Sequence, residues 1–226
     1  MGIRHGPLPP SGLLLDARNL GRRVAGRWLW RGLDLALAAG ERLAVSGPSG
    51  SGKTLLLRAL AGLDGLDEGE IELQGRGLRS WSMPRYRTQV AYLPQRPAMV
   101  EGTVEDNLQL PFGLAAHRST PFPERSARRA LGQLGRGESF LRQRTEELSG
   151  GEAQLVAVLR VLLLEPSVLL LDEPTASLDE AATVALEDLV AAWLNGAPER
   201  AVIWTSHQQT QLERVANRRL TLAGHA

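Results

Sequence analysis

The residues with the clearest capacity for chemistry lie in one run, Gly47-Pro48-Ser49-Gly50-Ser51-Gly52-Lys53-Thr54. The run fits the pattern G-x-x-x-x-G-K-[ST], in which loop N–H groups, a lysine and a hydroxyl surround phosphate oxygens. Of the 26 lysines and arginines in the chain, Lys53 is the only lysine. A compact ammonium fits among loop amides, and a planar guanidinium does not replace it. We therefore predict a nucleotide-phosphate site and reject the alternative that a glycine-rich turn carries Lys53 by accident.

Two carboxylates follow the apolar run 168–171, which is typical of a buried parallel strand. Asp172 ends this strand, where its carboxylate can hold Mg²⁺ opposite the hydroxyl of Thr54. Glu173 comes next and can orient or activate a water molecule for attack on a phosphate. The alternative is an acidic surface pair after a strand, and the phosphate loop argues against it.

Two further polar side chains follow predicted strands. Gln95 lies just past a strand at 89–93, where a neutral amide can contact both Mg²⁺ and the attacking water. His207 follows a strand at 201–206. Its place after Glu173 in the chain favours contact with the γ-phosphate over a purely structural role.

A second glycine-containing helix start occurs at Leu148-Ser149-Gly150-Gly151-Glu152. Glycines at a helix start expose amide N–H groups to an anion, and Ser149 adds a hydroxyl donor. The chain already has one phosphate loop, so this second anion-binding start is expected to serve the nucleotide of another subunit.

Strands and helices must alternate to position these residues. Apolar patterning predicts further strands at 13–15, 33–37, 42–46 and 70–73. Helical spacing and stop signals predict helices at 53–61, 150–164 and 180–195. The stretch from Pro94 to about Leu164 is expected to be mostly helical, with helices beginning near Thr103 and Pro123.

Composition limits the classes of protein that remain. The 226 residues are 43% hydrophobic with a net charge of +1, which fits a globular domain and gives no global field for nucleic acid or membranes. The absence of cysteine excludes disulfides, thiolate metal sites and cysteine catalysis. No run reaches the ~18 apolar residues of a membrane span, and residues 1–12 are expected to be a disordered tail without a signal-peptide core. A cytoplasmic location is therefore expected, with a partner holding the chain at a membrane.

In their order along the chain, these motifs resemble the nucleotide-binding domain of the ATP-binding cassette (ABC) family. The resemblance covers about 13–222 and rests on the phosphate loop, Gln95, the run Leu148 to Glu152, the acidic strand end and His207, together with the loop Ser177-Leu178-Asp179. It implies an α/β fold with a P-loop NTPase core, in which a mostly parallel sheet is flanked by helices and joined by an antiparallel β subdomain. It also implies a single domain over 13–226, with an α-helical subdomain inserted at about 96–164.

The resemblance implies a mechanism as well. Two copies would form a head-to-tail homodimer that closes on two Mg-ATP, and Ser149, Gly150 and Gly151 of each copy would complete the site of the other. Asp179 would communicate across that interface. Hydrolysis would use Lys53 and the loop amides on the phosphates, Glu173 on water, and His207 on the γ-phosphate.

One departure from the family concerns the nucleobase. The family usually stacks adenine on an aromatic residue in its first hairpin, and the corresponding stretch here, Leu20 to Val24, has none. Two side chains are candidates to replace the aromatic residue: Trp28, by swinging in, and Arg23, by stacking its guanidinium plane on the base.

Three classes of function are compatible with such a cassette. The first is the ATP-hydrolysing subunit of a transporter, which would move a separately encoded integral-membrane permease through the region 96–111. The second is a soluble ABC ATPase that acts on ribosomes, nucleic acid or protein complexes; a single cassette without a coiled coil or basic extension argues against it. The third, a degenerate scaffold, is disfavoured because the hydrolytic residues are all present.

Short runs at 86–90, 106–108 and 203–207 are similar to small bacterial ATPases assigned to iron export. Lipid or lipoprotein traffic is the competing assignment of cargo.

Overall fold

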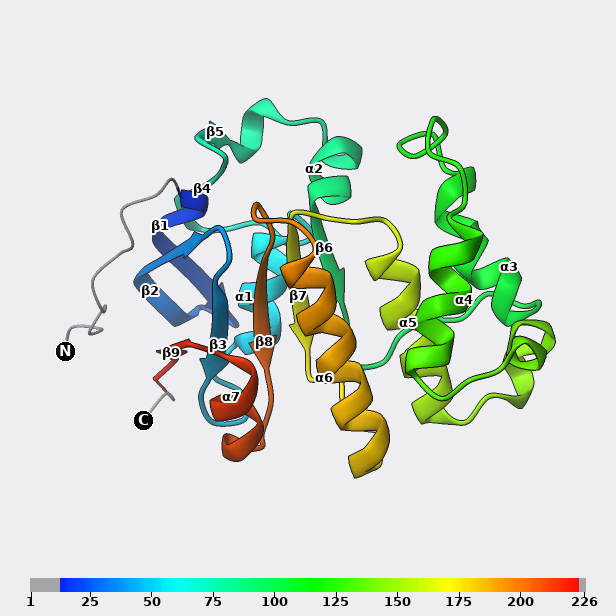
Figure 1. Ribbon diagram of the computed structural model, residues 1–226. Coiled ribbons are helices and arrows are strands. Elements are labelled where there is room, and N and C mark those ends of the chain that lie inside the picture. Colours follow the sequence, from blue (N-terminus) through cyan, green and yellow to red (C-terminus); the bar gives the residue numbers. More distant parts are fainter. Residues whose placement is uncertain (1–12, 224–226) are drawn as a thin grey trace.

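The computed structural model describes residues 13–223 and contains two β-sheets, with helices on both faces of the larger one (Figure 1). The smaller sheet has the strand order β2-β1-β4-β5 and is antiparallel; the larger has the order β6-β7-β8-β3-β9 and is parallel. The strands are β1 (Leu13–Val24), β2 (Arg27–Ala38), β3 (Arg42–Ser46), β4 (Glu68–Leu73), β5 (Arg76–Gly77), β6 (Val90–Leu93), β7 (Val168–Asp172), β8 (Ala201–Thr205) and β9 (Arg218–Thr221). This arrangement confirms the predicted α/β class with a parallel core and an antiparallel β portion.

The helices fall into two groups, three of them gathered at the end of the molecule far from the smaller sheet (Figure 1). The α-helices of the described residues are α1 (Lys53–Leu60), α2 (Met83–Gln89), α3 (Val104–Gln109), α4 (Glu124–Gln133), α5 (Gly150–Leu162), α6 (Glu180–Asn195) and α7 (Gln209–Val215). The gathered helices α3, α4 and α5 all lie within the stretch predicted as an inserted helical block. Short 3₁₀ turns occur at Leu78–Ser80, Leu110–Gly113, Glu138–Arg142 and Thr145–Glu147.

The parallel sheet separates two hydrophobic cores, because alternate residues of a strand point to opposite faces. Leu169 and Leu171 of β7 pack in one core with α5 and α6. Val168 and Leu170 pack in the other core, together with α1 and the smaller sheet. The helix that follows the phosphate loop and the helix that follows Ser149 therefore cover opposite faces of the same sheet.

Two helix starts, those of α5 and α3, are capped by reciprocal hydrogen bonds. Ser149 accepts a hydrogen bond from the backbone of Glu152, whose side chain accepts from the backbone of Ser149, and Thr103 and Asp106 form the same reciprocal pair at α3. Helix α6 covers the predicted residues, whereas α5 ends at Leu162, two residues earlier than expected.

Helical turns make up most of the stretch from Pro94 to about Leu164, as predicted, in three α-helices and three 3₁₀ turns that loops separate. The lengths predicted for the first two strands were wrong. The first two strands are 12 residues long each, much longer than the apolar runs that predicted them. Arginine-rich segments extend both strands, because their backbones pair in the hairpin whatever side chains they carry.

Four elements were not predicted from the sequence: α2, α7, β5 and β9. Each is short and rich in polar residues, so that apolar periodicity gives no signal there. The tail expected at residues 1–12 lies outside the described residues. Within residues 13–223, none of the helices combines the length and the apolar character needed to cross a bilayer.

Candidate nucleotide site

The phosphate loop connects β3 to α1, and its backbone shape depends on glycine. Gly47 has φ 150° and Gly52 has φ 89°, a range that other residues rarely adopt. A Cβ atom on Gly47 would come within 2.7 Å of the carbonyl oxygen of Leu222, and one on Gly52 within 2.4 Å of the Leu29 side chain. The loop is thus pressed against strand β2 and the chain end after β9, and only glycine fits at these two positions.

Lys53 opens helix α1 with its side chain folded back over the loop. Its ammonium donates hydrogen bonds to the carbonyl oxygens of Gly47 (2.9 Å) and Pro48 (3.3 Å), and the residue is only 7% exposed. The next residue, Thr54, is exposed in the first turn of the helix. The first turn of α1 therefore carries a cation and a hydroxyl next to the amide groups of the helix start, where an anion binds favourably.

Asp172 is held at the end of β7 by hydroxyl groups from the two neighbouring strands. The hydroxyl of Tyr92 on β6 donates to Oδ2 (3.0 Å), and that of Thr205 on β8 donates to Oδ1 (2.9 Å). Burial, followed by the charge of Asp172, raises the pKa of Tyr92, which keeps the phenol protonated as a donor. Asp172 is 2% exposed, and its carboxylate orientation is fixed by both bonds.

Glu173 brings three of the predicted site residues into contact. The amide of Gln95 donates to Oε2 of Glu173 at 2.7 Å, and Nε2 of His207 lies 2.7 Å from Oε1. Gln95 and His207 come from the loops after β6 and β8, the two strands that flank β7. Because parallel strands end at one edge of the sheet, residues distant in sequence meet there.

The backbone of Glu173 is strained. Its φ of 50° lies in the left-handed region, which is uncommon for residues other than glycine. A hydrogen bond from its N–H to the hydroxyl of Thr205 (3.0 Å) helps to hold it there. Such strain costs about 1–3 kcal/mol and concentrates at active sites, where the surrounding structure maintains it.

Ser149 and Asp179 lie apart from this group of residues. Ser149 starts α5 on the face of the sheet opposite to α1, with its hydroxyl engaged with Glu152 (2.8 Å). Gly150 and Gly151 follow in the first turn, and a Cβ atom on Gly151 would approach the carbonyl oxygen of Ser177 to 2.9 Å. Asp179 caps α6 by accepting a hydrogen bond from the backbone of Ala182 (2.8 Å).

The first hairpin contains an arginine stacked on a tryptophan. The guanidinium carbon of Arg23 lies 4.1 Å from the centroid of the Trp28 ring, and that of Arg31 lies 4.8 Å from it. Arg23 and Trp28 are paired across the two strands, at the hairpin whose strand β2 packs against the phosphate loop through Leu29. The two candidates for contact with the nucleobase thus form one stacked unit.

The donor set near Asp172 suits magnesium, a hard cation that prefers oxygen ligands. Thr54 offers a hydroxyl, Gln95 an amide oxygen, and each carboxylate oxygen of Asp172 keeps a lone pair beyond its one hydrogen bond. Between residues 13 and 223 there is no cluster of three or more histidines or acidic residues that could hold a metal ion by itself. These residues therefore fit an ion that arrives with phosphate oxygens.

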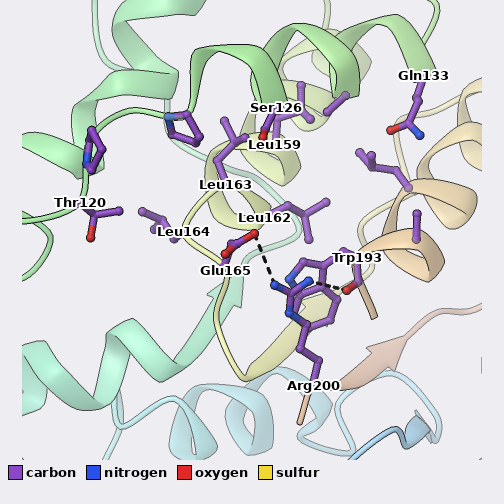
Figure 2. A pocket seen from close by; sticks show the side chains of 15 residues that line it. Thr120, Ser126, Gln133, Leu159, Leu162, Leu163, Leu164, Glu165, Trp193 and Arg200 are labelled. Atoms are coloured by element: carbon purple, nitrogen blue, oxygen red, sulfur yellow. Dashed lines mark hydrogen bonds and ion pairs between the residues drawn. The ribbon is translucent and has the colours of Figure 1, made fainter. Parts of the chain in front are cut away.

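A cavity of about 330 Å³ elsewhere in the molecule lies between α4, the end of α5 and α6 (Figure 2). Arg200 points up to its edge and donates to the carbonyl oxygen of Trp193 at 2.6 Å, close to the end of α6. A cation at a helix C-terminus satisfies free carbonyl groups and the helix dipole. Arg200 is thereby explained as a helix cap, and the cavity includes none of the residues of the nucleotide site.

Two residues of the site were not predicted from the sequence, Tyr92 and Thr205. Both belong to strands that the sequence did predict: Tyr92 is the last residue but one of β6, and Thr205 is the last residue of β8. The signal that pointed to them is a hydroxyl group near the end of each strand that neighbours the acidic strand end.

Comparison with known proteins identifies the family. The family model described as "ABC transporter" matches residues 30–176. The chain is 32% identical over 215 residues to the "Probable iron export ATP-binding protein FetA" of Escherichia coli, covering 94% of this chain and 92% of that protein. It is 36% identical over 231 residues to a "Probable anion import ATP-binding protein" of Haloferax volcanii, covering 93% of this chain and 77% of that protein.

Solved structures agree in fold. An ATP-binding subunit of an ABC transporter superposes with a TM-score of 0.82 at 25% identity, over 94% of this chain and 88% of that one. A dimeric bacterial ABC transporter cassette superposes with a TM-score of 0.80 at 23% identity, over 92% of this chain and 94% of that one. With the phosphate loop, the acidic strand end and the extent of the family match, the chain belongs to the ABC transporter family as an ATP-binding, ATP-hydrolysing subunit.

Proposed function

We propose that the chain works as a homodimer in which two copies bind two Mg-ATP head to tail and drive a separately encoded membrane permease. The observation that carries the proposal is the position of the two anion-binding helix starts on opposite faces of one sheet. A single copy that bound ATP at Lys53 would leave Ser149, Gly150 and Gly151 without a nucleotide of their own. A second copy rotated by 180° would present them to the phosphate loop of the first, which is an isologous arrangement.

In the proposed site, the chain's own residues divide the work. The loop from Gly47 to Gly52 surrounds the phosphates with amides, and Lys53 exchanges its loop carbonyl partners for phosphate oxygens. Thr54, Gln95 and Asp172 would hold magnesium, which supplies positive charge to the developing transition state.

Glu173 is proposed to take the proton of the attacking water, and His207 to donate a hydrogen bond to the γ-phosphate. Gln95 and His207 now contact the carboxylate of Glu173. Both side chains must then turn from it toward the nucleotide. Hydrolysis is in this way coupled to the positions of the loops after β6 and β8.

The first prediction tests the dimer. Glu173→Gln keeps the shape of the side chain and removes its capacity as a base, so that ATP is bound and not hydrolysed. We expect this variant to elute as a dimer in size-exclusion chromatography with Mg-ATP and as a monomer with ADP. Lys53→Ala in the same background is the control, because it removes the phosphate contact and should stay monomeric. A Glu173→Gln variant that remains monomeric at saturating Mg-ATP would contradict the proposal.

Co-purification of partners tests the proposed permease and the proposed location. We propose that it lies in the cytoplasm at the inner face of the membrane, and that the tagged chain purifies from detergent-solubilised membranes with a multi-span protein. Recovery with ribosomes or nucleic acid instead would favour the non-transport class of ABC ATPase. The net charge of +1 gives no global field that would attract nucleic acid.

The proposed cargo is iron, moved outward. The similarity to the E. coli protein supports this proposal, whereas the name of the H. volcanii protein indicates that similar subunits serve other cargoes. Cells that lack the chain should accumulate iron and lose growth in iron excess. Unchanged iron content with a changed anion or lipoprotein distribution would redirect the assignment of cargo and leave the ATPase role intact.

A further inference from the structure

A network of buried polar side chains connects the segments that follow Glu173 and His207. Thr175, Glu187 and Gln211 are 7%, 8% and 0% exposed. The hydroxyl of Thr175 lies 3.0 Å from Nε2 and 3.1 Å from Oε1 of Gln211, and Nε2 also donates to Oε1 of Glu187 at 2.8 Å. The three residues join the loop before α6, helix α6 itself and helix α7.

This arrangement is costly unless every group is paired. Burying an amide or a carboxylate without partners costs several kcal/mol, whereas leucine or methionine would fill the same space without that cost. Here Arg214 donates to both oxygens of Glu187, at 2.6 and 2.7 Å, and thus compensates its charge. A fully paired network in a poorly polarisable interior fixes one geometry more strictly than apolar packing does.

The network joins the two segments that carry the reacting groups. Thr175 lies two residues after Glu173 and four before Asp179, and Gln211 lies four residues after His207 in the first turn of α7. On its other side the same loop is pressed against α5, where Gly151 approaches the backbone of Ser177. The loop between Glu173 and Asp179 is therefore held between α7 and the helix that begins at Ser149.

We propose that Gln211, with Thr175 and Glu187, is a positioning unit for ATP hydrolysis. It sets the loop 173–179 and the segment after His207 at one fixed separation, so that the carboxylate of Glu173 and the imidazole of His207 both stay at the strand ends where the nucleotide is proposed to bind. The inference rests on the proposed roles of Glu173 and His207. None of the three residues is a catalytic residue; they act through the two that are.

Gln211→Met tests the unit at nearly constant side-chain volume. It removes the hydrogen bonds of Gln211 to Thr175 and Glu187. We expect kcat for ATP to fall about 10- to 100-fold, the range that follows from a misplacement of about 1 Å. The KM for ATP and the Kd for ADP should stay within about twofold, because Lys53 and its loop adjoin α1, which packs on the other face of the sheet. Gln209→Met is the matched control: the residue is exposed on the same helix and bonds only to Glu213 at 3.2 Å.

A second pair of variants decides the matter if Gln211→Met does not fold. Thr175→Val removes only the hydroxyl and should lower kcat, whereas Thr175→Ser keeps it and should restore most of the rate. Native kcat in both Gln211→Met and Thr175→Val would overturn the proposal. Equal loss in Thr175→Val and Thr175→Ser, or a loss of ADP affinity parallel to the loss of kcat, would also overturn it, since either would indicate packing alone. A native protein without any ATPase activity would instead contradict the proposed function.

Discussion

At the scale of single residues, the proposed chemistry requires Asp172 and Glu173 to be held in different ways. They are neighbours in sequence but differ in environment. Asp172 is fixed by two hydroxyl groups, whereas Glu173 has a left-handed backbone and contacts the side chains of Gln95 and His207. The first is suited to a stable contact with an ion, and the second to a group that exchanges partners during a cycle. The strained backbone of Glu173 thus gives two adjacent carboxylates different proposed roles, ion binding for Asp172 and exchange of partners for Glu173.

Tyr92→Phe should separate site geometry from stability. The change removes one of the two donors to a buried carboxylate, and hydrogen bonds to charged groups contribute about 1.5–3 kcal/mol. We predict a loss of unfolding free energy in that range together with ATPase activity reduced about tenfold.

Tyr86→Phe is the control for this prediction. Tyr86 is also buried, and its hydroxyl donates to the carbonyl oxygen of Leu60 at 2.6 Å, away from Asp172. It should lose about 1 kcal/mol in urea unfolding and keep native ATPase activity. Equal activities of the two variants would show that the Tyr92 hydroxyl does not hold the site.

At the element scale, the start of α5 links stability to pH. The backbone N–H of Ser149 and then its hydroxyl lower the pKa of Glu152, which also lies 3.0 Å from Arg136. Because the folded state binds the proton more weakly, the carboxylate stabilises the protein above the unfolded pKa of about 4.3. That contribution is lost as the pH falls through the lower pKa of the folded state.

We therefore predict that Glu152→Ala costs about 1 kcal/mol of unfolding free energy at pH 7. The difference from the native protein should shrink as the pH drops below about 4. Urea unfolding of both proteins across this range measures it. A difference that stays constant with pH would mean that the carboxylate does not contribute through its charge.

The elements also show what the sequence could and could not predict. The run at 168–171 and the capped start at Ser149 were predictable, because buried strands and helix caps depend on local chemistry. The contacts of Gln95 and His207 with Glu173 were predictable only as a set of strand ends, and the distances required the sheet order. Helix α7 was not predictable, because Gln211 is a polar residue buried by tertiary pairing, which apolar periodicity does not register.

At the scale of the whole molecule, two copies are proposed to share each nucleotide site. Gly150 offers a way to damage one half of the site without unfolding the chain, because a Cβ atom there meets no other atom and its φ is not positive. Gly150→Glu should fold and should repel a phosphate brought to the start of α5. Gly132→Glu is its matched control, since a Cβ atom in α4 also meets nothing.

The decisive measurement is ATPase complementation between Lys53→Ala and Gly150→Glu. Each variant alone should be inactive, because every one of its sites contains a defect. Mixed in equal amounts, they should recover about a quarter of native activity, since half of the dimers are mixed and each of these has one intact site. An inactive mixture, with Gly132→Glu fully active and both variants folded, would contradict the account, because it would place Lys53 and Gly150 in the same site of a single chain.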